Sequence, residues 1–287
     1  MAGTDINRST IALPTEVSSK ILAKAQESSA VMKLAQPIAL PGLGLTIPVI
    51  TGDPEAEWVT ETGKKPVKRG TLDKKVMQAY TLAVIVPFSN QFKRDMSGLY
   101  NAIISRLPNA LAKKFDATVF GNASAPGSNF DTLAACTAQS FGSDPYTALV
   151  SADADIAAHD GIANGYVISP AAKSKLLLSK DNDGRPLFIN SVAEGAIPMI
   201  LGNPTYQSKA VYKNVSSGND VIGVAGDWTQ AFYGIAQNLN LSISDQATLT
   251  DADGSVINLW QQNMFAVRAE IEVGFVADTT AFNLLTE

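Results

Sequence analysis

The hydrophobic pattern in the middle of the chain has a period of four. Apolar residues recur at every fourth position in the row Leu99, Ile103, Leu107, Leu111, Phe115 and Val119. That spacing predicts a helix over residues 97–120 with one apolar face. Gly121-Asn122 supplies a stop, and Pro108 predicts a bend or an interruption within the helix.

Near the C-terminus the period changes to two. The apolar residues Phe265, Val267, Ala269, Ile271, Val273 and Phe275 alternate with Arg268, Glu270 and Glu272. The alternation predicts a strand that covers a core with one side and meets solvent or a neighbouring molecule with the other. We expect this strand to pack on the helix of residues 97–120, so that segments far apart in the sequence form one domain.

Alternation also predicts a long hairpin. Leu45, Ile47 and Val49 form one limb, in which Pro48 favours a sheet edge, and its expected partner is the run of residues 76–86. About 26 residues with few apolar side chains lie between the limbs. About 13 residues per limb would reach about 43 Å, whereas a compact chain of this length has a radius of gyration of about 19 Å. An isolated hairpin is marginally stable in water, so it should protrude and lie against something else.

The two limbs carry opposite charges. Acidic residues occupy the outgoing limb, namely Asp53, Glu55, Glu57 and Glu61, and basic residues the returning limb, namely Lys64, Lys65, Lys68, Arg69, Lys74 and Lys75, interrupted by Asp73. Cross-strand pairing accounts for some of these charges, at roughly 0.2–1 kcal/mol per pair. Six cations and five acids cannot all pair internally in good geometry, and Trp58 is an aromatic anchor of the type enriched at interfaces.

The N-terminal segment carries only weak periodicity. Its first 13 residues predict an extended arm, and a helix is expected from Pro14 because Val17, Ile21 and Ala25 recur at a spacing of four. The apolar stripe is narrow, so it needs a neighbour, in the same chain or in another copy, to bury it. Residues 37–44 predict an irregular linker.

Between the long helix and the C-terminal strand, the pattern predicts a mixed α/β unit from about residue 130 to 255. The small, polar residues 123–143 mark its boundary. Its expected elements are a helix from Asp144-Pro145 to about Ala158, a short buried strand at 166–168, a helix capped by Ser169-Pro170 and ending at Ser179, a turn at 181–184, and strands at 221–224 and 239–244.

Composition excludes several function classes. The 287 residues are 46% hydrophobic and 17% charged, which is typical of a globular protein, and the net charge of −5 argues against a broad basic face for DNA phosphates. A single Cys136 excludes an intrachain disulfide, and with His159 as the sole histidine no zinc site can be built from His and Cys. The chain has no apolar run long enough to span a bilayer and no apolar core of a secretion signal, which predicts a soluble protein in a reducing compartment.

The charge is distributed unevenly along the chain. Residues 1–120 contain 15 Lys and Arg against 10 Asp and Glu, whereas residues 121–287 contain 7 against 17. Two interpretations remain open. Either two solvated surfaces differ, or the basic half of one molecule attracts the acidic half of the next.

No catalytic constellation is complete. His159 lies at the end of a predicted helix, where a cation interacts favourably with the helix dipole, and no G-x-S-x-G motif accompanies it. The sequences DNDG at 181–184 and DADG at 251–254 lack the ligand spacing of a calcium loop and predict turns. We therefore predict no catalytic residue, cofactor or metal site; a hydrolase using His159 is the enzyme alternative.

Six sequence blocks in one order resemble the major capsid proteins of tailed bacteriophages, the Hong Kong 97 fold family. They are LPTEV, AEWVTETGK, VPFSNQFKRD, SPAAKSKLLLSKDNDGRPLF, GDWTQAFYGI and NMFAVRAEIEVGFVADTTAF. The resemblance covers essentially the whole chain and implies an α+β capsid fold. Its parts would be an N-arm (1–43), an extended loop formed by a β-hairpin (44–91), a discontinuous peripheral domain with a long spine helix (92–129 and 256–287) and an axial domain (130–255).

The resemblance implies a protein that self-assembles through pentamers and hexamers into an icosahedral head around double-stranded DNA, in the bacterial host cytoplasm. It also implies a portal, a cement protein and no membrane. It implies either a separate scaffolding protein or none, because only about 13 residues precede LPTEV. The expected contacts between subunits come from the extended loop, through Glu55, Glu57, Trp58, Glu61, Lys64, Lys65, Lys68 and Arg69, and from the N-arm, through Val17 and Ile21.

Two points stay open at the level of the sequence. The family prototype joins its subunits through a Lys–Asn isopeptide bond, and Lys64 or Lys65 could serve as that lysine, but no motif identifies the partner Asn, so non-covalent charge pairing is expected. The alternative function is an encapsulin-like bacterial compartment shell that encloses a cargo protein. The content of native particles, nucleic acid or protein, would distinguish the two.

Overall fold

A computed structural model describes residues 29–42, 44–52, 57–61, 64–65, 67, 71–90, 96–142, 144–180, 183–185, 187–188, 199–216, 218–251 and 253–287. The fold is α+β. Its helices are α2 (Ala30–Leu34), α3 (Met96–Val119), α4 (Pro145–Ala158) and α5 (Pro170–Leu178). Its strands are β1 (Gln36–Ala39), β2 (Leu45–Gly52), β3 (Thr71–Met77), β4 (Tyr80–Ser89), β5 (Thr137–Ser140), β6 (Gly165–Ile168), β7 (Met199–Ile200), β8 (Asn203–Gln207), β9 (Val221–Gly226), β10 (Ala231–Ser244), β11 (Thr248–Thr250), β12 (Val256–Asn258), β13 (Met264–Ala277) and β14 (Phe282–Thr286).

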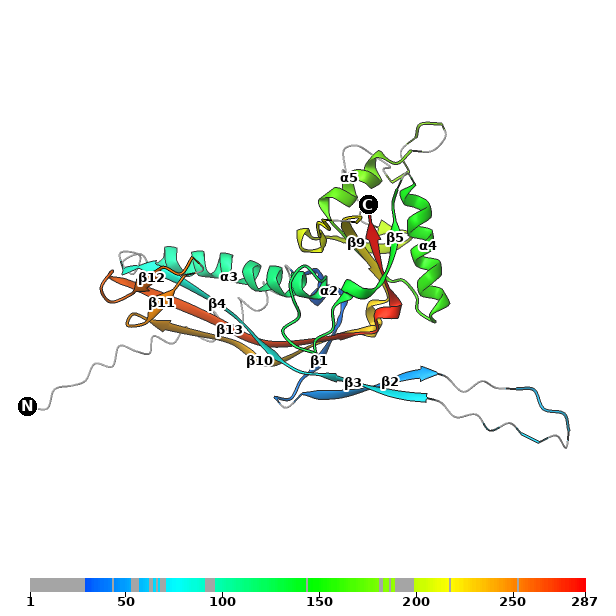
Figure 1. The fold of residues 1–287 in the computed structure, drawn as a ribbon, viewed down its shortest axis with the longest axis horizontal. Coiled ribbons are helices and arrows are strands. Elements are labelled where there is room, and N and C mark those ends of the chain that lie inside the picture. The colour runs from blue at the N-terminus through cyan, green and yellow to red at the C-terminus, as the bar shows by residue number, and fades with distance from the viewer. Residues whose placement is uncertain are drawn as a thin grey trace, which may run out of the picture.

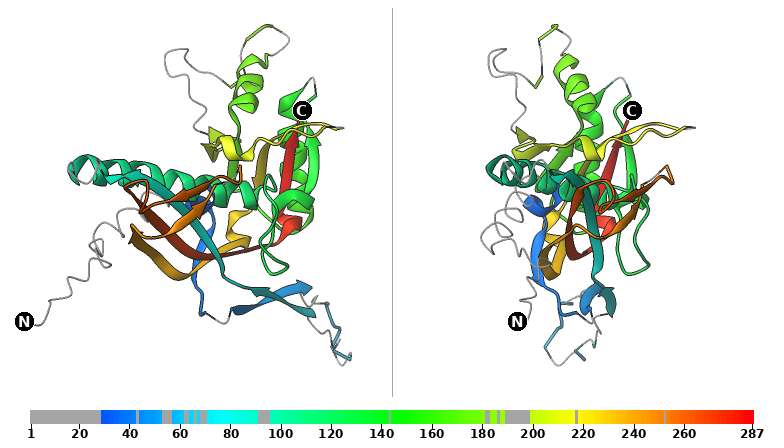
Figure 2. Two further views of the ribbon diagram at one scale, coloured as in Figure 1. Left: turned by 60° about the vertical axis from the view of Figure 1, so that its left-hand side comes forward. Right: turned by 90° about the vertical axis from the view of Figure 1, so that its left-hand side faces the viewer.

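The described strands form a four-stranded sheet, a six-stranded sheet and two hairpins, β2–β3 and β11–β12 (Figure 1). A four-stranded sheet with the order β1-β10-β13-β4 carries α3 along one face. A six-stranded sheet with the order β5-β14-β9-β6-β8-β7 packs against α4 and α5. The hairpin of β2 and β3 extends away from both sheets, as the sequence predicts, and the two further views in Figure 2 agree.

Helix α3 forms where the four-residue period predicts it. Leu107, Leu111, Phe115 and Val119 are all buried, and the first two pack against Phe265, Val267, Ala269 and Ile271 of β13. The predicted packing of the C-terminal strand on this helix is therefore confirmed. The helix runs through Pro108 without a break, so the predicted interruption is wrong, and the alternative of a bend stays a prediction.

The helix ends as predicted. Gly121 adopts a left-handed backbone with φ +76°, a conformation that glycine reaches without the steric penalty of a Cβ atom. Its N–H donates to the Thr118 carbonyl at 3.1 Å, and Asn122 N–H donates to the Ala117 carbonyl at 2.7 Å. These bonds pair carbonyls of the last helical turn that have no partner inside the helix.

The predicted hairpin differs from the structure in its second limb. The run of residues 76–86 is not one strand: β3 ends at Met77 and pairs with β2, while β4 starts at Tyr80 and pairs with β13. The two residues between them, Gln78 and Ala79, carry the chain from one sheet to the other. The predicted linker over residues 37–44 is also partly wrong, because β1 pairs in parallel with β10.

The two helices predicted for the α/β unit are confirmed. Asp144 caps α4 by accepting from the N–H groups of Tyr146 and Thr147, and Ser169 caps α5 by accepting from Ala172. The expected boundary at residue 255 nevertheless does not separate the two sheets, because each sheet contains strands from both sides of that residue. The strand expected at 239–244 lies within β10 and pairs with β13, whereas β14 pairs with β5 and β9 in the six-stranded sheet.

The described parts of both Asp-Gly segments are turns. Gly184 and Gly254 have φ of +80° and +84°, and Gly254 N–H donates to the Asp251 carbonyl at 3.0 Å. The predicted N-terminal helix, with Val17 and Ile21, lies outside the described residues.

Candidate assembly surfaces

The root of the hairpin lies in a notch made by two glycines. Gly234 of β10 and Gly274 of β13 face each other in register. A Cβ atom on Gly274 would lie 2.7 Å from the Gln78 carbonyl oxygen, and one on Gly234 would lie 2.7 Å from the Leu40 Cβ. The missing side chains allow Leu40 and Met77 to pack in a small cluster with Val276. The sheet thus holds both ends of the hairpin at one place.

A partly buried ion pair fixes the same root. Lys75 Nζ donates to the Ala277 carbonyl at 2.6 Å and to Asp131 Oδ2 at 3.1 Å. Asp131 Oδ2 also accepts from the Ala277 backbone N–H at 3.2 Å, so the carboxylate bridges the hairpin and β13. Because apolar packing and charge-assisted hydrogen bonds act together, the body of the subunit determines the direction in which the hairpin leaves it.

The tip of the hairpin is exposed wherever the structure describes it. The side chain of Trp58 has 106% relative exposure, and Val67 has 86%. Glu57, Glu61, Lys64 and Lys65 are exposed as well. Glu55, Lys68 and Arg69, the remaining predicted contact residues of this loop, lie outside the described residues. Trp58 is therefore an exposed apolar group, of the residue type that is enriched at protein interfaces.

A second attachment joins α2 to the long helix. The Ser29 hydroxyl donates to Asp116 Oδ1 at 2.5 Å, and the Ala30 N–H donates to Asp116 Oδ2 at 2.9 Å. Asp116 is 2% exposed, and burial raises the pKa of its carboxyl from 3.8 to about 6, against the lowering effect of these hydrogen bonds. The sequence prediction did not include this site; the acid between Phe115 and Val119 on the buried face of the helix is the signal that could have shown it.

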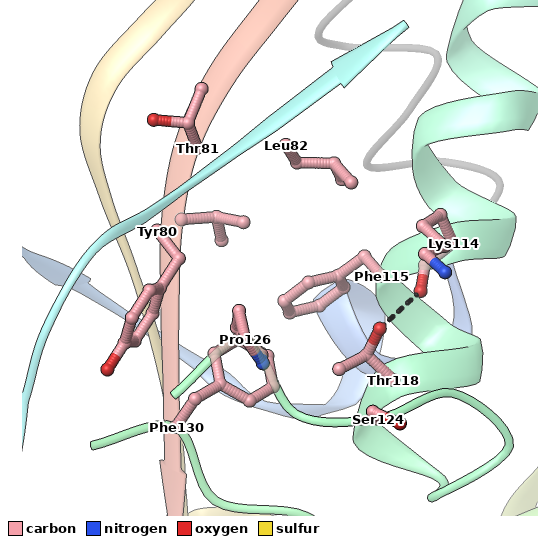
Figure 3. Close-up of a pocket in the computed structure, with 10 residues that line it drawn as sticks. Tyr80, Thr81, Leu82, Lys114, Phe115, Thr118, Ser124, Pro126 and Phe130 are labelled. Atoms are coloured by element: carbon pink, nitrogen blue, oxygen red, sulfur yellow. Dashed lines mark hydrogen bonds between the residues drawn. The ribbon is translucent and has the colours of Figure 1, made fainter. Parts of the chain in front are cut away.

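A pocket opens between α3, β4 and the loop of residues 121–130 (Figure 3). Its volume is about 160 Å³, and its lining consists of Tyr80, Thr81, Leu82, Lys114, Phe115, Thr118, Ser124, Pro126, Phe130 and Val273. The Phe130 ring lies edge-on to both Tyr80 and Phe115, with ring centroids 6.3 Å apart in each pair. The Thr118 hydroxyl donates to the Lys114 carbonyl at 2.9 Å. The pocket therefore has an aromatic floor and a cation at its rim.

His159 and Cys136, the single histidine and the single cysteine of the chain, have different surroundings. His159 is exposed at the C-terminal cap of α4, and its Nδ1 is 2.8 Å from the Asp155 carbonyl oxygen. Cys136 is buried, and burial raises the pKa of its thiol to about 12, which keeps it protonated and unreactive. Among the described residues, no group of three or more His, Cys, Asp and Glu side chains is placed to bind a metal. No helix in the described part of the chain has the length and apolarity needed to cross a membrane.

These features define a class of protein by its fold: an α+β chain with an anchored, protruding hairpin. The family described as the phage capsid family matches residues 10–286. This chain belongs to the phage capsid family, a family of structural proteins.

Named relatives agree with the family. The chain is 30% identical to the "Probable major capsid protein gp17" of Mycobacterium phage L5 over 294 aligned positions, which cover 96% of this chain and 89% of the relative. It is 25% identical to the "Major capsid protein" of Staphylococcus phage 80alpha, with 94% of this chain and 83% of the relative covered. The names of these relatives give no support to the encapsulin-like alternative.

Solved structures share the fold. A chain from Mycobacterium phage Adephagia superposes with a TM-score of 0.73 at 22% identity, covering 90% of each chain. A chain from a structure titled "Capsid of native GTA particle computed with C5 symmetry" superposes with a TM-score of 0.63 at 15% identity, covering 100% of this chain and 95% of the other. The capsid fold is therefore common to chains whose sequences have diverged widely.

Proposed function

We propose that this chain is the major capsid protein of a tailed bacteriophage and that its copies assemble, through pentamers and hexamers, into an icosahedral head enclosing double-stranded DNA. The observation that carries the proposal is the hairpin: its root is fixed to the body by Lys75 and Met77, while its tip presents Trp58 to solvent. The root of the hairpin is anchored, and its tip exposes both apolar and charged side chains. Such a tip suits a contact that a second copy of the chain completes.

In this proposal the parts of the subunit have the roles found in the Hong Kong 97 fold. The N-arm comprises residues 1–43, the extended loop 44–91, the peripheral domain 92–129 and 256–287 with α3 as its spine, and the axial domain 130–255. The pairing of β10 with β13 and of β14 with β9 supports a refinement, in which β10 serves the peripheral part and β14 the axial part.

The contacts between subunits are assigned to the two extended segments. In the hairpin they involve Glu55, Glu57, Trp58, Glu61, Lys64, Lys65, Lys68 and Arg69, and in the N-arm they involve Val17 and Ile21. We further propose a scaffolding protein, a portal and a cement protein as partners, assembly in the host cytoplasm, and no enzymatic activity. The net charge of −5 suits a shell that contacts its DNA non-specifically and releases it.

Sedimentation velocity and negative-stain electron microscopy of the purified chain test the proposal. Closed shells, or rings of five or six subunits, are expected from the chain expressed alone or with its proposed scaffolding partner. A compact monomer under both conditions would contradict the proposed function. Nucleic acid in particles from phage-producing cells distinguishes a phage head from a compartment that encloses a cargo protein.

The role of the hairpin has a separate test. The fourfold variant with Lys64, Lys65, Lys68 and Arg69 each changed to Glu should remain folded, as measured by circular dichroism, and should fail to form closed shells. The matched control keeps the charge, with Lys64→Arg, Lys65→Arg, Lys68→Arg and Arg69→Lys, and should assemble. A normal particle yield from the charge-reversed variant would overturn the role of the loop.

A further inference from the structure

We propose that the indole ring of Trp58 from one subunit inserts into the pocket between α3, β4 and the loop of residues 121–130 of a neighbouring copy. The inference rests on the proposed function, that copies of this chain assemble with one another. It assigns a particular acceptor to the hairpin tip and a particular occupant to the pocket.

The occupant comes from another molecule because the hairpin of the same chain points elsewhere. Lys75 and Met77 fix its root at the edge of the four-stranded sheet, and Figures 1 and 2 show the β2–β3 ribbon running away from α3. Trp58 is fully exposed, and the neighbouring Val59 is 39% exposed. The tip therefore carries a continuous apolar group that its own subunit leaves in water.

The pocket matches an aromatic ring in size and chemistry. An apolar cavity of roughly 150 Å³ binds benzene, and this one measures about 160 Å³. Its floor already contains an edge-to-face arrangement of Tyr80, Phe130 and Phe115 (Figure 3), which a further ring can extend in the geometry that aromatic side chains prefer. At the exposed side, the Ser124 hydroxyl oxygen can accept a hydrogen bond from the indole N–H.

The charges around the two surfaces are complementary. Lys114 contributes an exposed ammonium group to the rim of the pocket. On the hairpin, Glu61 follows Trp58 by three residues and is exposed. With the ring in the pocket, this carboxylate lies near the rim, where pairing with Lys114 fixes the register of the tip.

Disulfide trapping tests the juxtaposition while leaving Trp58 in place. The double variant Val59→Cys with Ser124→Cys puts one thiol on the tip and one at the mouth of the pocket, and the native Cys136 is buried and does not compete. After mild oxidation of assembled particles, a ladder of covalent multimers is expected on a non-reducing gel. The control pairs Val59→Cys with Thr250→Cys, an exposed position on β11, and should give no ladder.

Particles that assemble without the ladder would overturn this inference and leave the proposed function standing. If the unmodified chain forms no particles under any condition, the proposed function fails, and this inference fails with it. The two failures are therefore distinguishable in one experiment.

Tryptophan fluorescence gives a second readout that needs no cysteine. In a Trp260→Phe background only Trp58 and the buried Trp228 remain. Acrylamide should quench the fluorescence of Trp58 strongly in free subunits and several-fold less in particles. In a separate test, the variant Pro126→Trp places a ring that blocks the pocket, and it should lower the particle yield at least tenfold. Equal quenching of Trp58 in free subunits and in particles would contradict the insertion.

Discussion

Asp116 shows how one buried carboxylate can join two segments distant in sequence. It accepts hydrogen bonds from the Ser29 hydroxyl and the Ala30 N–H, 87 and 86 residues away. Burial raises its pKa to about 6, so the protonated form is favoured more in the folded chain than in the unfolded chain. The stabilising effect of that proton is complete below the unfolded pKa of 3.8 and is lost as the pH rises through about 6.

The variant Asp116→Asn tests this pH dependence. The free energy of unfolding of the parent should fall between about pH 4 and pH 6 by an Asp116 contribution on the order of 2–3 kcal/mol. The amide can still accept from Ala30 and donate to Ser29, so the variant should fold and lose this part of the pH dependence. Urea unfolding at several pH values measures it, and the same slope in parent and variant would contradict the assignment.

The glycine notch leads to a prediction about the hairpin root. Gly274→Ala places a Cβ atom 2.7 Å from the Gln78 carbonyl oxygen, which is backbone and cannot move without the hairpin. We expect a loss of about 1–3 kcal/mol in the free energy of unfolding, as for other overpacked cores. Gly42→Ala is the matched control, because a Cβ there has no atom within 4 Å, and it should change stability little. Thermal unfolding of both variants checks the difference.

These residues show where prediction from the sequence stops. Trp58 and the exposed charges of the hairpin follow from local composition, because a polar segment of that length cannot bury them. Asp116 and the pair Gly234 and Gly274 become meaningful only through contacts with Ser29, Leu40 and Gln78. Such contacts depend on strand register and helix packing, which local periodicity does not determine.

At the scale of elements, one residue of α3 lowers the stability of the helix. Pro108 lies in its interior, where it cannot donate a hydrogen bond to the Ile104 carbonyl. Pro108→Ala should therefore raise the free energy of unfolding, by up to about 3 kcal/mol. Guanidinium unfolding checks this, with Ala110→Pro two residues later as the opposite control, which should destabilise. A less stable Pro108→Ala variant would mean that the helix depends on the proline ring.

The hairpin is an element whose anchoring can be weakened without changing its tip. Lys75→Met keeps the length of the side chain and removes its bonds to Asp131 and the Ala277 carbonyl. We expect the variant to fold and to show faster amide hydrogen exchange in β3. Its free energy of unfolding should fall by about 1–3 kcal/mol. Lys113→Met, at an exposed position of α3, is the control. Unchanged exchange in β3 would show that Met77 and Leu40 anchor the hairpin alone.

Elements with strong local signals were predicted well. The helices α3, α4 and α5, together with β6 and β13, have amphipathic patterns or capping residues that act over a few positions. The errors occur where neighbours in the sequence separate in space. The chain leaves one sheet at Gln78 and enters another at Tyr80, and β1 forms only because β10 offers it an edge. No periodicity marks either event.

At the scale of the whole molecule, the uneven charge predicts a dependence on salt. Residues 1–120 contain 15 Lys and Arg against 10 Asp and Glu, and the remainder contains 7 against 17. If basic and acidic surfaces of different copies attract each other, particle yield should fall when the ionic strength rises from about 0.05 M to about 0.5 M, because the screening length shortens severalfold. Light scattering during assembly measures this. A yield independent of salt would favour the interpretation in which the two surfaces merely differ.

The position of β14 has a consequence for the order of events during protein synthesis. This strand, residues 282–286, lies between β5 and β9 in the six-stranded sheet, although the ribosome makes it after every other strand of that sheet. In a nascent chain, β5 and β9 therefore lack the strand that pairs with both of them until residue 286 has emerged from the ribosome. We therefore expect chains that terminate before residue 282 to lack this strand and to leave the six-stranded sheet incomplete.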